Sequence, residues 1–128
     1  MAELWYLRAT NQERLHEYAN AEQGYQRALA IMKHVESLIP PGKSSAPGSL
    51  IEKYLFALAF LYDLQGNSSE ASRYYAEGVE MARRNWAGEP KDSDIIRSHI
   101  WTKVWHLRLM DRIEEAERLE QRLEHPPR

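Results

Sequence analysis

The chain has 128 residues, enough for one domain with a hydrophobic core but too few for two. Hydrophobic residues make up 43% of it, and a formal net charge of −2 produces no strong field to attract nucleic acid or an anionic membrane. The absence of cysteine excludes disulfides and cysteine-based metal sites or nucleophiles, and it is typical of a reducing compartment.

The longest apolar run, residues 55–62, is too short to span a bilayer. The first residues, MAELWYLRATNQER, lack the basic segment and long apolar run of a signal peptide. We therefore expect a single cytoplasmic domain over residues 1–128 that binds neither membrane nor nucleic acid.

The spacing of apolar residues predicts helices only, in three antiparallel pairs. In chain order, the expected helices span residues 2–15, 18–39, 50–64, 68–86, 94–110 and 113–124. Segments rich in Pro, Gly, Ser or other turn-forming residues separate the pairs, and they cover residues 40–49 and 87–93. The predicted fold class is all-α, with units of residues 2–39, 50–86 and 94–124.

A pattern recurs in the second helix of each pair. It reads YANAEQGYQRALAI from Tyr18, SSEASRYYAEGVEM from Ser68 and, more weakly, IEEAERLEQRLE from Ile113. Each copy has one stripe of positions four and three residues apart, and small residues there let a second helix approach closely. The stripes are Ala21, Tyr25 and Ala28, then Ala71, Tyr75 and Gly78, then Ala116, Glu120 and Leu123. A helical unit that recurs in this way predicts a stacked solenoid.

The first copy resembles the second helix of a tetratricopeptide repeat, in the longer-period variety found in kinesin light chain. The second unit is similar to both helices of that repeat, at Leu55, Leu58, Ala59, Tyr62, Gly66, Ala71 and Tyr75. Arg8, Lys103 and Glu120 depart from the pattern. The resemblance implies a short right-handed superhelix whose first helices line a concave groove that binds peptides or protein segments.

The resemblance also implies which side chains face that groove. Phe56 and Phe60, like Trp101 and Trp105, are four residues apart and share a helical face. Aromatic rings are enriched at binding hot spots, so we expect a non-enzymatic adaptor for an amphipathic helix or an extended apolar segment. The expected partner-binding residues are Tyr6, Thr10, Lys53, Phe56, Phe60, Trp101, Trp105 and Arg108, and the remaining groove positions are Glu3, Glu13, Asp63 and Ser98.

Other interpretations stay open at this point. An aromatic stripe at helical spacing is also typical of a packed core, so Trp101 and Trp105 fit either place. The same surface would also suit a structural assembly module that self-associates or docks within a larger protein. A small helical enzyme is the third class.

No catalytic, cofactor or metal site is expected from the sequence. The segment Gly42-Lys43-Ser44 superficially resembles a phosphate loop, but Ser37 stands where the motif needs glycine and no strand precedes it. His99 and His106 are seven residues apart, whereas a metal site needs three or four converging ligands. Neither paired carboxylates nor a Ser/His/Asp group is legible in the chain.

Overall fold

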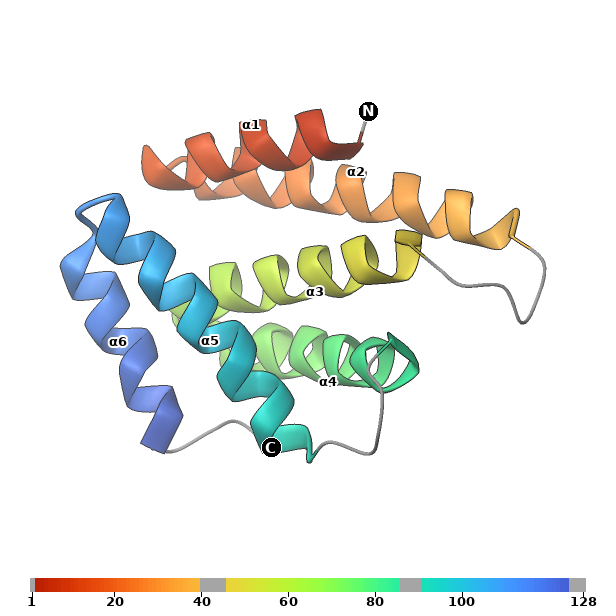
Figure 1. Cartoon of the computed structure of the whole chain (residues 1–128). Helices are drawn as coiled ribbons and strands as arrows, with labels where there is room; N and C mark the ends of the chain where they lie inside the picture. Colours follow the sequence, from red (N-terminus) through yellow and green to blue (C-terminus); the bar gives the residue numbers. More distant parts are fainter. Residues whose placement is uncertain (1, 40–45, 86–90, 125–128) are drawn as a thin grey trace.

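The structure, a computed structural model, describes residues 2–39, 46–85 and 91–124, and these residues form helices and no strand (Figure 1). The all-α fold class is therefore confirmed. The helices are α1 (Ala2–Arg14), α2 (Tyr18–Ser37), α3 (Ala46–Leu64), α4 (Ser68–Asn85), α5 (Asp92–Leu109) and α6 (Ile113–Glu124).

Two helices begin earlier than the sequence predicts. α3 starts at Ala46, within the expected first linker, and Pro47 is tolerated there because a first helical turn does not need its N–H. α5 starts at Asp92, within the expected second linker. The other linker residues, with the segment that resembles a phosphate loop, lie outside the described residues except for Lys91, which directly precedes α5. The side chain of Leu123 also lies outside them.

The three helix pairs close with the same turn. One residue in each turn has a left-handed backbone, namely His16 (φ 62°), Gly66 (φ 82°) or Asp111 (φ 60°). The N–H of the following residue donates to the carbonyl five positions back, as in a Schellman-type helix end. These bonds run from Glu17 to Gln12 (2.8 Å), from Asn67 to Tyr62 (2.9 Å) and from Arg112 to Leu107 (2.8 Å). The internal repeat is thus present in the backbone of all three pairs.

A side-chain link between the two helices of a pair also recurs, always between residues twelve positions apart. In the first two pairs a tyrosine hydroxyl donates to a carboxylate, and in the third an ion pair replaces this bond. The links are Tyr25 to Glu13 (2.8 Å), Tyr75 to Asp63 (2.9 Å) and Arg108 with Glu120. Glu120 departs from the sequence pattern but keeps the link, because its negative charge pairs with the positive charge of Arg108.

Close packing within the pairs depends on small residues. A Cβ on Gly24 of α2 would lie 2.8 Å from the Cβ of Ala9 in α1, and a Cβ on Gly78 of α4 would lie 2.7 Å from the ring of Phe56 in α3. The prediction of a close approach along this stripe is confirmed at Gly78.

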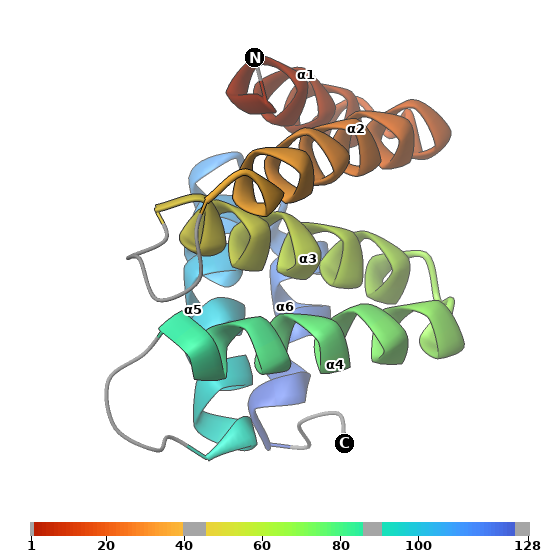
Figure 2. The ribbon, with the colours of Figure 1, turned by 90° about the vertical axis from the view of Figure 1, so that its right-hand side faces the viewer.

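The third pair does not continue the stacking of the first two. Helices α1 to α4 lie in successive layers, with α3 at the centre, whereas α5 and α6 run across these layers (Figures 1 and 2). α5 contacts α4 at its start, through Asp92 and Arg83, then α3 through His99 and Glu52, and finally α1 through Lys103 and Glu13. The layered arrangement therefore includes α1 to α4 only, and α5 lies across the layers of α4, α3 and α1.

The variant Gly78→Ala tests this packing. We expect it to lower the free energy of unfolding by about 1 kcal/mol, because overpacking against Phe56 outweighs the better helix propensity of alanine. The ring of Phe56 also contacts His99 and Tyr75, so it has little room to move away. Urea unfolding measures the change, with the exposed position Ser72→Ala on the same helix as control. A Gly78→Ala protein as stable as the wild type would contradict the close approach.

Candidate functional site

Helix α5 has two chemically different sides. Its inner side packs against the rest of the protein with five fully buried aliphatic residues, Ile95, Ile96, Ile100, Val104 and Leu107. With 3.6 residues per turn, Trp101 and Trp105 lie on the side of α5 opposite to these residues, so they project away from the core. Both are exposed, at 58% and 64% of their surface.

A buried carboxylate holds the inner side of α5 over α1. Glu13 is 0% exposed, and its carboxylate accepts hydrogen bonds from Nζ of Lys103 and Nη1 of Arg112, both at 2.9 Å. The hydroxyl of Tyr25 donates a third bond at 2.8 Å. Arg112 also donates from Nε to Glu115 at 2.8 Å. Two acids and two bases thus compensate each other in one cluster, as buried charges require.

The charges of this cluster keep Glu13 ionised. Burial alone would raise the pKa of its carboxyl, but the charge and hydrogen bond of Lys103 and the charge of Arg112 outweigh burial, and the pKa falls below its usual value. Burial and the adjacent Glu13 raise the pKa of the Tyr25 hydroxyl far above its ordinary value. A general acid or base works best with a pKa near the operating pH. The pKa values of Glu13 and Tyr25 are both shifted away from neutral pH, so the cluster suits a structural role, which is to hold α5 in place.

A second carboxylate holds α5 about one turn before Lys103. Glu52 of α3 is 5% exposed, and it bonds to His99 of α5 and accepts a bond from Nδ2 of Asn85 in α4 at 3.1 Å. The imidazole of His99 stacks on Phe56 with 3.8 Å between ring centroids. Three helices therefore meet at this carboxylate.

Two of the predicted groove residues lie in the core. Phe56 and Phe60 are 1% and 3% exposed, and both rings pack against Tyr75. The expectation that they line an open groove is corrected here. Tyr75 of α4 packs against both rings and His99 of α5 stacks on Phe56, so neither ring is open to a partner.

Three further predicted residues gather where α1 faces α3. Nζ of Lys53 lies 4.2 Å from the ring centroid of Tyr6, and Oγ1 of Thr10 donates to the carbonyl of Tyr6 at 2.9 Å. Lys53 also pairs with Glu3 at 3.5 Å. Burial raises the pKa of Tyr6 above its usual value, although the bond with Thr10 opposes the shift. This group is half-buried and internally satisfied, so it offers a partner little open surface.

The remaining predicted residues lie on the outer side of α5. Leu109, which sequence reasoning missed, is 70% exposed and follows Trp105 by four residues. Its spacing was the signal, since Trp101, Trp105 and Leu109 recur every four positions and form one stripe. We call these three residues the tryptophan stripe. Arg108 lies beside it and pairs with Glu120 of α6. Large apolar side chains exposed in a row mark interaction sites.

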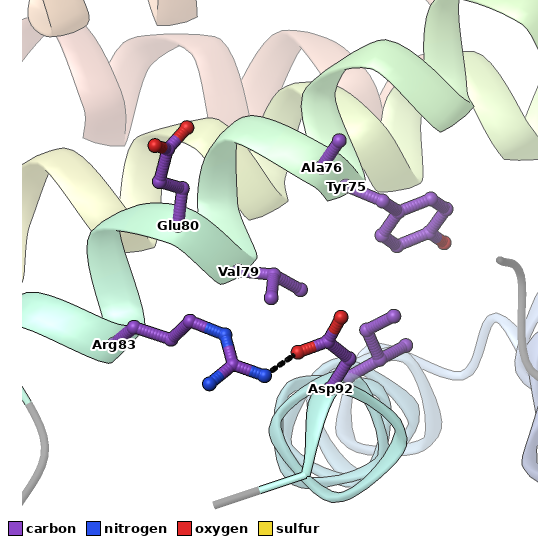
Figure 3. A pocket seen from close by; sticks show the side chains of 7 residues that line it. Tyr75, Ala76, Val79, Glu80, Arg83 and Asp92 are labelled. Carbon is purple, nitrogen blue, oxygen red and sulfur yellow. Dashed lines mark hydrogen bonds and ion pairs between the residues drawn. The ribbon is translucent and has the colours of Figure 1, made fainter. Parts of the chain in front are cut away.

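A pocket of about 360 Å³ lies between α4 and the start of α5 (Figure 3). Val79 and Ile96 supply apolar wall, and Arg83 of α4 pairs with Asp92 of α5 at its edge. This ion pair links α5 to α4. Because the two charges bind each other, the surface that the pocket offers a ligand is mainly apolar.

Comparisons of the chain with protein-family models, with curated proteins and with solved structures find no match. Among residues 2–39, 46–85 and 91–124, no group of three or more His, Asp or Glu side chains is placed to hold a metal ion. Within these same ranges, none of the helices combines the length and the apolar character needed to cross a membrane. The site must therefore be interpreted from its own geometry, and its main feature is the tryptophan stripe.

Glu13→Gln tests the buried cluster. We expect it to lower the free energy of unfolding by about 3 kcal/mol, because it leaves an uncompensated positive charge among Lys103, Arg112 and Glu115. Chemical unfolding at pH 7 measures the loss. The exposed carboxylate Glu80→Gln serves as control and should change stability by less than about 0.5 kcal/mol. Equal stabilities of the two variants would refute the anchoring role of Glu13.

The lowered pKa of Glu13 also predicts a pH dependence. The stability that its ionised form contributes is complete above the pKa of an unfolded glutamate, about 4.3, and is lost as the pH falls through the lower folded value. The difference in unfolding free energy between wild type and Glu13→Gln should therefore shrink as the pH falls below about 4. Unfolding curves from pH 6 to pH 2 provide the measurement. A difference that stays constant over this range would contradict the ionised, charge-paired state.

Proposed function

We propose that this protein is a non-enzymatic protein-binding module, an adaptor whose contact surface is the outer side of α5. The single observation that carries the proposal is the tryptophan stripe, exposed on a helix whose opposite side is anchored by buried charges. A preformed, anchored helix loses little conformational entropy when a partner binds.

The energetics favour burial of this stripe. Covering the exposed part of each indole removes roughly 100–150 Å² of mostly apolar surface from water, worth about 3 kcal/mol per ring. Trp is also among the residues most often found at binding hot spots. A partner helix with its own apolar stripe, or an extended apolar segment, would supply the matching surface.

The wider architecture fits the same proposal. The repeated turns and the layered α1 to α4 are consistent with the superhelical arrangement of tetratricopeptide repeats, with α5 lying over part of the inner wall. In this proposal the binding surface moves from that wall to the outer side of the covering helix. We place the protein in the cytoplasm, because a chain without cysteine suits a reducing compartment.

A capture experiment tests the proposal. The immobilised full chain is compared with Trp101→Ala/Trp105→Ala, and bound proteins are quantified by mass spectrometry. We expect the double variant to capture at least about tenfold less of the specific partner, because truncating a hot-spot Trp costs about 2 kcal/mol or more of binding free energy. Leu4→Ala/Leu7→Ala on α1 is the matched control, since it also removes two exposed apolar side chains.

Circular dichroism and the Tm must show that all three proteins remain folded. Capture that is undiminished in the folded tryptophan variant would refute the outer side of α5 as the binding surface.

A further inference from the structure

The outer side of α5 changes its charge from one end to the other. Asp94 lies seven residues before Trp101, and Arg108 lies seven residues after it; both are exposed. Seven residues are close to two helical turns, so all three side chains project from the same side of the helix. The face therefore has Asp94 at its start, the indoles at its centre and Arg108 at its end, and the exposed Arg97 lies between Asp94 and Trp101.

Such a face is complementary to itself only in one orientation. When two α5 helices pack antiparallel across their indoles, Asp94 of each copy comes beside Arg108 of the other, and both ends are matched. Parallel packing would place acid against acid and base against base, which is unfavourable. The dipoles of two antiparallel helices also oppose each other favourably.

Arg108 can serve this contact while keeping its bond within the monomer. Its side chain is 49% exposed although it pairs with Glu120. A guanidinium group has five N–H donors, so a second carboxylate can bind at the exposed edge.

From this charge order we infer that the tryptophan stripe binds α5 of a second copy of this chain, in an antiparallel packing with twofold symmetry. The inference rests on the proposed function, because it names the occupant of the same surface. Both copies use the same patch, so the assembly closes as a dimer and leaves no second patch for open-ended growth.

The size of the surface predicts a reversible dimer. α5 has 18 residues and is therefore about 27 Å long. Two helices of this length bury an area at the low end of that of specific interfaces, and binding must also offset the loss of rotational and translational freedom. We expect a Kd of the dimer in the micromolar range.

Sedimentation of the full chain over a range of concentrations tests the inference. The wild type should shift from one to two copies per particle as the concentration rises from about 1 μM to about 1 mM, the range that a micromolar dimer implies. Trp101→Ala/Trp105→Ala should raise the Kd at least about 100-fold, and the control Leu4→Ala/Leu7→Ala should leave it unchanged. A monomer at every concentration, or a tryptophan variant that dimerises like the wild type, would overturn the inference.

A charge exchange tests the orientation. Asp94→Arg alone should weaken the dimer about three- to tenfold, because it faces the positive Arg108 of the other copy. Adding Arg108→Glu restores the contact between copies, and adding Glu120→Arg preserves the ion pair within the hairpin. The triple variant should therefore recover most of the wild-type affinity if packing is antiparallel. A triple variant that stays as weak as Asp94→Arg would overturn the antiparallel arrangement.

The two proposals fail in different ways. A chain that stays monomeric but loses its captured partner in the tryptophan variant refutes the second copy as occupant and supports the adaptor. A chain that dimerises through the stripe and captures nothing else identifies its partner as itself. A folded tryptophan variant that changes neither self-association nor capture refutes both.

Discussion

The placement of α5 depends on buried carboxylates, above all on Glu13. Glu13 lies between Lys103 and Arg112, which are 90 and 99 residues further along the chain. Apolar contact is non-directional and would tolerate several placements of an aliphatic helix side. Buried charges do not, because another register would leave Glu13 or its two partners unpaired at a cost of several kcal/mol. The aliphatic residues of α5 therefore determine which side faces inward, and the ionic cluster fixes where that side sits.

With α5 placed in this way, two aromatic pairs of the same spacing differ in their exposure to solvent. Phe56 and Phe60 lie on α3 and are part of the core, where both pack against Tyr75 of α4 and Phe56 also stacks on His99 of α5. Trp101 and Trp105 lie on the crossing helix itself and remain exposed, because Ile100 and its neighbours occupy the inner side. Each pair has the spacing of four that brings two rings to one helical face. The spacing indicates that the two rings share one side of a helix, but only the tertiary packing determines whether that side is exposed to solvent.

The three helix pairs keep their geometry where their sequences diverge. Each turn has one left-handed residue, although the residue is His16, Gly66 or Asp111, and only glycine adopts this backbone without a steric penalty. The link between residues twelve positions apart changes from a hydroxyl–carboxylate bond to an ion pair in the third pair. The repeat is therefore conserved within the chain as a set of contacts more faithfully than as a set of residue types.

The sequence by itself determined the helices, their pairing and the close approach at Gly78, because these follow from local periodicity and turn residues. It contained Glu13 as a groove position and Lys103 as a departure from the repeat pattern, but nothing local could join two charges 90 residues apart. Only the tertiary structure decided that α5 lies across α4, α3 and α1 and exposes its tryptophans. The physical reason is that such a crossing is set by long-range charge pairing and burial, which a period of 3.6 residues does not encode.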